Sequence, residues 1–76
     1  MEPRELELID KYSEKNAELK ILWEEHQLYE KQLEKLEKKP YLTPSEDQVV
    51  RDIKKKKLAG KTKMQSILDR YKNLEE

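Results

Sequence analysis

The 76 residues contain 17 Lys and Arg, 17 Asp and Glu, and no Cys, and only 34% of them are hydrophobic. We expect a single domain over residues 1–76, because a chain of this length forms one domain at most and has too few apolar side chains for the core of a large enzyme. The lack of Cys excludes disulfides, and the longest apolar run, residues 21–23, is far shorter than the roughly 20 residues of a membrane-spanning helix. The sequence does not open with a secretory signal, so we expect a cytoplasmic protein.

The first predicted element is a helix over about residues 4–38. The segment is rich in Glu, Lys and Leu, and Pro3 suits an opening turn, whereas Pro40 disfavours helical structure in the residue before it. Its seam positions recur alternately every four and three residues, as in a coiled coil. These positions are Leu8, Tyr12, Lys15, Leu19, Leu22, His26, Tyr29, Leu33 and Leu36.

A loop over residues 39–43 is predicted to lead to a second helix over about residues 44–74. Thr43 and Glu46 have the spacing of a capping box, with Pro44 at the first helical position. Gly60 lies inside this helix and lowers its stability by about 1 kcal/mol relative to Ala, but it does not end the helix. The same seam rhythm continues at Val50, Ile53, Lys57, Gly60, Met64, Ile67, Tyr71 and Leu74.

The predicted fold class is all-α, an antiparallel two-helix hairpin that resembles a coiled coil. The short loop makes the helices antiparallel, so seam residues at equal distances from the loop face each other. His26 then faces Gly60 and Tyr29 faces Lys57. The other expected pairs are Leu36 with Val50, Leu33 with Ile53, Leu22 with Met64, Leu19 with Ile67, and Tyr12 with Leu74.

Further apolar side chains lie off this seam, and a two-helix rod has no further layer to bury them. They are Ile9, Ile21, Trp23, Leu28, Val49, Leu58 and Leu68. We therefore expect either two hairpins packed as a four-helix bundle or a docked partner helix. The candidate interaction surface consists of Ile21, Trp23, Leu28 and Leu58, with Trp23 as the interface anchor.

Positive charge is concentrated in the second half of the chain. Residues 1–38 hold eleven acidic and seven basic side chains, whereas residues 39–76 hold six acidic and ten basic ones. A candidate basic patch consists of Lys54, Lys55, Lys56, Lys57, Lys61 and Lys63. One interpretation is a stripe that binds nucleic-acid phosphates. We favour the other, in which these lysines lie along Glu24, Glu25 and Glu30 of the first helix, because four successive lysines point around all sides of a helix.

We predict no catalytic residue, no cofactor and no metal site. His26 is the only histidine, and with Glu30 four residues later it provides too few ligands for zinc, so a polar seam position is the favoured interpretation. Gly60, Lys61 and Thr62 match the last three residues of a phosphate-binding loop motif. The glycine required five residues earlier is absent, since Lys55 occupies that position, and the segment lies within a helix.

Two segments together resemble a known family. The first combines Leu19, Leu22, Glu24, Glu25, His26, Leu28, Leu33, Leu36 and Glu37, and the second combines Ile53, Lys54, Lys55, Lys57, Leu58, Lys61, Met64 and Leu68. The pattern resembles the YdcH-like family of small bacterial helical-hairpin proteins, whose function is not established. Gly60 replaces an apolar residue of that pattern, and Thr62 and Lys63 replace an acidic pair. The resemblance implies a cytoplasmic hairpin without known enzymatic activity or cofactor.

The function expected from the sequence is a small noncatalytic coiled-coil module for protein–protein interaction. Its partner would be another protein or a second copy, forming a homo-oligomer, with neither a membrane nor a small-molecule substrate involved. The alternative is a nucleic-acid-associated protein that binds phosphates through the basic patch. A salt series distinguishes the two, because phosphate binding weakens steeply as the salt concentration rises.

Overall fold

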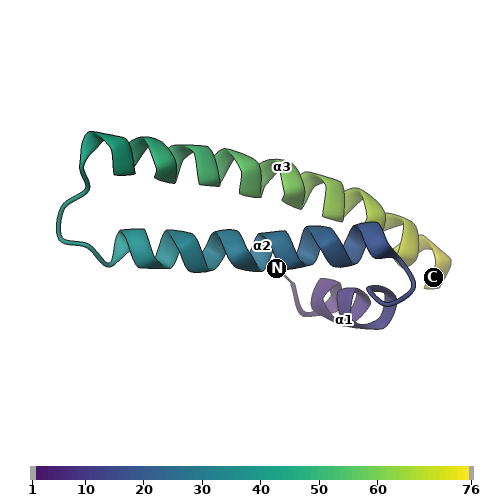
Figure 1. Cartoon of the computed structure of the whole chain (residues 1–76). Helices are drawn as coiled ribbons and strands as arrows, with labels where there is room; N and C mark the ends of the chain where they lie inside the picture. The colour runs from purple at the N-terminus through teal and green to yellow at the C-terminus, as the bar shows by residue number, and fades with distance from the viewer. Residues whose placement is uncertain (1, 76) are drawn as a thin grey trace.

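A computed structural model describes residues 2–75. It contains three helices, α1 (Pro3–Tyr12), α2 (Ala17–Glu37) and α3 (Pro44–Glu75), and no strand among the described residues. The helices α2 and α3 form a long antiparallel hairpin, and α1 folds back beside the end of the hairpin that lies away from the α2–α3 loop (Figure 1). The molecule measures 47 × 19 × 17 Å. The all-α class is confirmed, but a third helix is present.

The prediction of one helix over about residues 4–38 is wrong, because the chain turns at residues 13–16. Asn16 has an extended backbone, with φ −128° and ψ 100°, and its side-chain oxygen accepts a hydrogen bond of 3.1 Å from the Leu19 backbone N–H group. The turn allows α1 to bury Leu8 and Ile9 against the hairpin. Burying an aliphatic side chain of this size contributes about 1.5–3 kcal/mol, which outweighs the roughly 0.5–1.5 kcal/mol of each backbone hydrogen bond lost at the break.

The start of α3 follows the predicted capping box. The Thr43 hydroxyl accepts a hydrogen bond from the Glu46 N–H group at 3.1 Å, and the Glu46 carboxylate accepts one from the Thr43 N–H group at 3.2 Å. Lys39 forms an ion pair with the same Glu46 carboxylate. Residues 38–43 connect α2 to α3, and these contacts fix the residue at which α3 begins.

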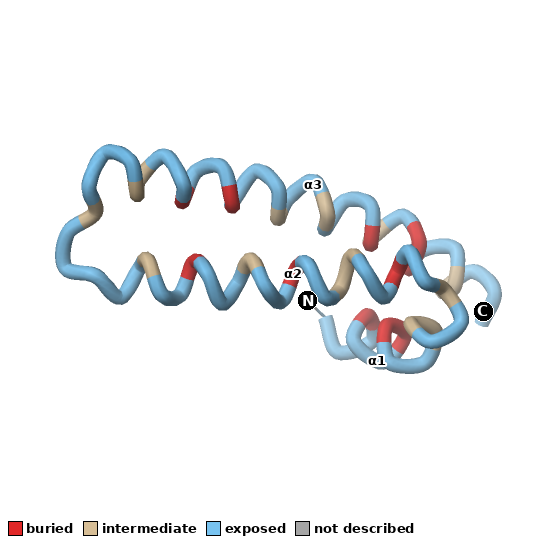
Figure 2. The backbone as a smooth tube through the Cα atoms, viewed as in Figure 1, coloured by how far each residue is buried: buried red, intermediate tan, exposed pale blue. Residues whose placement is uncertain are grey.

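Two clusters of buried apolar residues hold the molecule together (Figure 2). The cluster near the loop consists of Leu33, Val50 and Ile53, with Tyr29, Leu36 and Leu42 packed against it. The cluster at the α1 end consists of Leu8, Ile9, Leu19, Met64, Ile67 and Leu68, with Tyr12, Leu22, Trp23 and Tyr71 packed against it. Four of the five expected apolar pairs have both partners in the same cluster. Two off-seam residues, Ile9 of α1 and Leu68 of α3, are buried together in the cluster at the α1 end.

The fifth expected pair, Tyr12 with Leu74, is wrong. The Tyr12 ring stacks on the Tyr71 ring, with centroids 3.9 Å apart, and Leu74 is 77% exposed. The Tyr71 hydroxyl accepts a hydrogen bond of 3.0 Å from the Asn16 side chain. The turn at residues 13–16 is thus tied directly to the last turns of α3.

Candidate functional site

One stripe of α3, which we call the flank stripe, lies beside the seam. Its members are spaced alternately by four and three residues, so they share one face of the helix. They are Lys54, Leu58, Lys61, Gln65, Leu68 and Lys72. The flank stripe is the part of α3 on which both α1 and an open groove are found.

The helix α1 covers the half of the flank stripe toward the end of α3. Leu68 is fully buried in the cluster that contains Leu8 and Ile9. The buried Glu5 carboxylate contacts the Gln65 side chain and lies 4.0 Å from Lys72 Nζ. Burial is the largest influence on the Glu5 pKa and raises it, but the contacts with Gln65, the Glu2 backbone and Lys72 together lower the pKa below its usual value.

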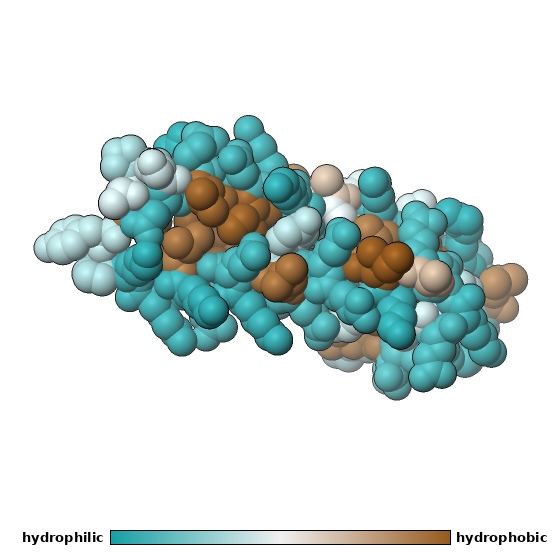
Figure 3. All heavy atoms as spheres, viewed as in Figure 1, coloured by the Kyte–Doolittle hydropathy of each residue, from teal (hydrophilic) through white to brown (hydrophobic). Residues whose placement is uncertain are grey.

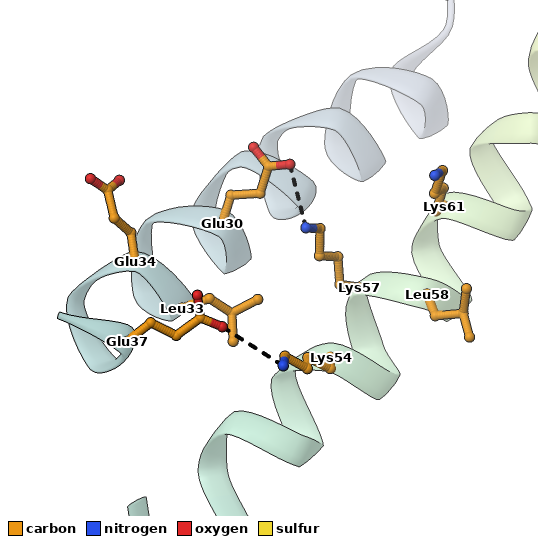
Figure 4. A pocket seen from close by; sticks show the side chains of 8 residues that line it. All are labelled: Glu30, Leu33, Glu34, Glu37, Lys54, Lys57, Leu58 and Lys61. Atoms are coloured by element: carbon orange, nitrogen blue, oxygen red, sulfur yellow. Dashed lines mark ion pairs between the residues drawn. The ribbon is translucent and has the colours of Figure 1, made fainter. Parts of the chain in front are cut away.

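The other half of the flank stripe lines an open groove between α2 and α3, with a volume of about 520 Å³ (Figure 4). We call it the flank groove, and it is lined by Glu30, Leu33, Glu34, Glu37, Lys54, Lys57, Leu58 and Lys61. Its acidic side chains all come from α2 and its basic side chains all come from α3. Lys57 Nζ lies 3.5 Å from Glu30, and Lys54 Nζ lies 3.7 Å from Glu37.

The flank groove leads toward α1. A smaller hollow next to it is lined by Leu58, Lys61, Thr62 and Gln65, and the Gln65 side chain contacts Glu5 of α1. Leu58 is 66% exposed and takes part in both hollows. The flank groove is therefore the uncovered continuation of the surface on which α1 lies.

The four predicted interaction residues do not share one face. Leu58 lines the flank groove, and Ile21 and Leu28 are 55% and 52% exposed. However, Ile21 lies two residues before Trp23, and Leu28 lies two residues before Glu30, and both Trp23 and Glu30 are on the groove side of α2. A step of two residues turns a helix by more than half a circle, so Ile21 and Leu28 point away from the groove. Trp23 packs against the cluster at the α1 end, so it is part of the fold. Apolar side chains on the face shown in Figure 3 likewise gather in separate areas framed by polar ones.

The six lysines of the predicted basic patch are also divided. Lys54, Lys57 and Lys61 line the flank groove, whereas Lys56 lines a second groove of about 550 Å³ formed by other residues of α2, of α3 and of the connection between them. Gln32, Lys35, Leu36, Lys39, Val49 and Ile53 complete that second groove. Glu30 pairs with the lysines as expected. Glu37 occupies the role expected of Glu24 and Glu25, which form no ion pair with these lysines among the described residues.

His26 lies between the two apolar clusters and is buried. Its Nε2 atom lies 3.0 Å from Glu30 Oε1, the same oxygen that pairs with Lys57, and its ring stacks on Trp23 with centroids 5.8 Å apart. The buried Nδ1 atom has no hydrogen-bond partner among the described residues. Burial, together with the positive charges of Lys57 and Lys61, lowers the pKa of His26, although Glu30 opposes this shift. A neutral ring with its proton on Nε2 fits these contacts.

Sequence reasoning identified Leu58, the lysines of the flank groove and Glu30 of its acidic wall, but it missed Glu34 and Glu37. Glu34 and Glu37 follow Trp23 and Glu30 on one side of α2, with spacings of seven, four and three residues. This rhythm beside the seam, matched by Lys54, Leu58 and Lys61 on α3, was the available signal.

Neither a metal cluster nor a membrane-spanning helix occurs in the part of the chain that the structure describes. No three His, Cys, Asp or Glu side chains between residues 2 and 75 are grouped so that they could hold a metal ion. No helix in the same range combines the length and apolar character needed to cross a membrane.

Comparison with known proteins places the hairpin in a family. No curated protein and no solved structure matches the chain. Residues 19–68 match the family described as a protein of unknown function (DUF465). This range includes most of α2 and of α3 and both walls of the flank groove, whereas α1 and the turn at residues 13–16 lie outside it. Because the match spans more than half of the sequence, the chain belongs to the DUF465 family.

Proposed function

We propose that this protein is a noncatalytic protein-interaction module whose flank groove binds an amphipathic helix of a partner protein. The observation that carries the proposal is α1 itself, because it shows which kind of element packs on the flank stripe. It does so by burying Leu8 and Ile9 and by pairing Glu5 with Lys72. The flank groove offers the same stripe without an occupant among residues 2–75.

We expect the charges of the flank groove to match charged edges on the partner helix. Glu30, Glu34 and Glu37 form the wall on α2, and the lysines form the wall on α3 (Figure 4). A helix with basic residues toward α2 and acidic residues toward α3 would match both walls. An apolar residue between these edges would cover Leu33 and Leu58. The resemblance to YdcH-like proteins supports this proposal, because it too implies a helical hairpin without known enzymatic activity.

The size of the flank groove indicates a weak, specific contact. The seven-residue step from Lys54 to Lys61 corresponds to a length of roughly 11 Å at 1.5 Å per residue, which is about two helical turns. Leu58 is the only strongly exposed apolar side chain that lines the groove. Its full burial would contribute up to about 1.5–3 kcal/mol. We therefore expect Leu58 to dominate the apolar part of binding and the charged walls to set orientation.

A stapled helical peptide with one apolar stripe, one basic edge and one acidic edge tests the proposal. We expect chemical-shift changes in NMR titrations to concentrate on the residues that line the flank groove, and Leu58→Glu to abolish them. Leu28→Glu is the matched control, because Leu28 is similarly exposed but lies off the groove. A peptide with its two charged edges exchanged should bind more weakly. Equal binding by both peptides, or shifts that Leu58→Glu leaves unchanged, would contradict the proposal.

Sedimentation of the wild type and of Leu58→Glu tests the four-helix bundle expected from the sequence. If the protein's mass in sedimentation rises with concentration and Leu58→Glu prevents this rise, then the flank groove binds a second copy and not a different protein. If the mass stays monomeric while the peptide binds, then a different protein supplies the helix.

Nucleic-acid binding is the second candidate function, and one observation favours it. The second groove gathers Lys35, Lys39 and Lys56, and the lining of this groove contains no carboxylate. We expect any such binding to weaken steeply as salt rises, because phosphate contacts release counterions. The absence of a complex with single- or double-stranded oligonucleotides at low salt would eliminate this candidate.

A further inference from the structure

The turn between α1 and α2 is a hinge that needs little change to become helical. The Asn16 N–H group donates to the Tyr12 carbonyl at 2.9 Å and the Lys20 N–H group donates to the Asn16 carbonyl at 3.1 Å, the spacing found within an α-helix. Ser13 also has helical backbone angles, φ −60° and ψ −33°, whereas Asn16 is extended. Residues 13–16 include neither Gly nor Pro. Rotation at Asn16 therefore accounts for much of the difference between the bent chain and a continuous helix.

The seam rhythm runs through this hinge without interruption. Leu8, Tyr12, Lys15 and Leu19 are spaced by four, three and four residues. In a continuous helix over residues 3–37, Tyr12 would reach the last turn of α3, and Leu8 would project beyond its end at Glu75. Such a chain would expose Leu8 and Ile9 and, on α3, the Leu68 that they now cover. Each copy would then carry one uncovered helix and one uncovered docking surface for it.

We propose that α1 is exchanged between two copies of this chain. In the exchanged dimer, Asn16 is helical, and α1 of each copy packs on the other copy over Gln65, Leu68 and Lys72. The occupant of that surface is a second copy because every contact is one that the bent chain already makes. These contacts are the burial of Leu8 and Ile9, the ion pair between Glu5 and Lys72, and the contacts of Glu75 with Arg4 at 3.2 Å and Lys11 at 2.5 Å.

The exchange requires a change only at the hinge, since all other contacts are retained by symmetry. Short hinges are the segments at which such exchange occurs. This inference goes beyond the proposed function, because it concerns α1 and leaves the flank groove open in both forms.

Two substitutions move the equilibrium in opposite directions. Asn16→Ala removes the cap of α2 and introduces the residue with the highest helix propensity, which disfavours the bent chain by about fivefold at each hinge. With two hinges per dimer, the dissociation constant should fall by roughly 25-fold. Ala17→Pro is the matched opposite: proline suits the first position of α2 and an extended Asn16, but within a continuous helix it would clash with the carbonyl of Ser13.

Sedimentation equilibrium on the wild type and both variants measures these shifts. Isotope-filtered NOE spectra of a mixture of labelled and unlabelled chains then identify the contact, through signals between Leu8 of one chain and Leu68 of the other. We expect these interchain signals in the dimer of Asn16→Ala and a monomer for Ala17→Pro. If Asn16→Ala does not fold, then wild-type protein refolded at high concentration provides the same readout.

Two results would overturn the exchange. One is equal dimerisation of Asn16→Ala and Ala17→Pro, and the other is a dimer in which contacts between Leu8 and Leu68 remain within one chain. In either case the flank groove proposal stands, since its test depends on Leu58 and on an added peptide. Conversely, loss of peptide binding by the wild type would leave the exchange intact.

Discussion

Replacing Gly60 by Ala should stabilise the protein. Gly60 lies in the interior of α3, its φ angle is not positive, and a Cβ atom built on it would meet no neighbouring atom within 4 Å. A methyl group therefore fits without strain. The substitution also removes the conformational freedom that glycine gives the unfolded chain.

The expected gain follows from the helix propensities of the two residues. Gly is about 1 kcal/mol less favourable than Ala inside a helix, and nothing around Gly60 subtracts from this difference. For a domain of this size, a gain of about 1 kcal/mol raises the melting temperature by about 4–8 °C. Thermal and urea denaturation followed by circular dichroism at 222 nm, the usual helix band, would measure both values.

Ala59→Gly is the matched control, because Ala59 is exposed, precedes Gly60 in the same helix and should lose about as much as Gly60→Ala gains. An unchanged or lowered melting temperature for Gly60→Ala, together with the expected loss for Ala59→Gly, would refute the reasoning. It would mean that the space facing Gly60 is filled, so that the hairpin is packed more tightly at this point than described.

Three further predictions concern the rest of the fold. As pH falls from about 7 to 5, the free energy of unfolding should decrease, because the pKa of buried His26 is lowered and the unfolded chain therefore binds the proton first. Urea denaturation of the wild type and of His26→Gln should show this pH dependence only in the wild type. Leu68→Ala should cost about 2–5 kcal/mol, since Leu68 is fully buried beneath α1, whereas Leu74→Ala should cost almost nothing in the same assay; similar losses would contradict the placement of α1. Thr43→Ala should cost about 0.5–2 kcal/mol by removing the cap of α3, and Thr43→Ser should restore most of it; equal losses for both substitutions would show that the hydroxyl hydrogen bond is unimportant.

Local signals in the sequence were sufficient for the α2–α3 hairpin. The capping box of Thr43 and Glu46 depends on residues three apart, and the seam repeats over several turns, so neither needs information from distant parts of the chain. The predicted loop over residues 39–43 corresponds to the observed connection over residues 38–43 for the same reason.

The break before α2 depended on distant contacts, so the local pattern missed it. The four-three rhythm favoured a continuous helix through Lys15, and Asn16 as a cap was a weaker competing signal. What decided the outcome was burial of Leu8 and Ile9 against Leu68, which is about 60 residues away in sequence. Ile9 and Leu68 were off-seam apolar residues without an assigned neighbour, and this shared property was the clue that the hairpin was incomplete.

The candidate site was only partly predictable because two stripes, and not one, run beside each other on α3. Assigning four apolar residues off the seam to one interaction surface grouped Leu58 with Ile21 and Leu28, although helical geometry places these two on another side of the hairpin. The lysines were divided for the same reason, because successive residues point in different directions around a helix.

The middle of the hairpin connects the surface that α1 covers with the flank groove. The two apolar clusters are separated where His26 and Gly60 lie, so neither cluster extends along the whole rod. Glu30 links the interior of the hairpin to the flank groove, because one of its carboxylate oxygens lies next to both buried His26 and Lys57 of the flank groove. A partner helix in the flank groove would bury this oxygen further and cover Leu58. It would thereby extend the layer that α1 begins, from the α1 end of the rod toward the loop.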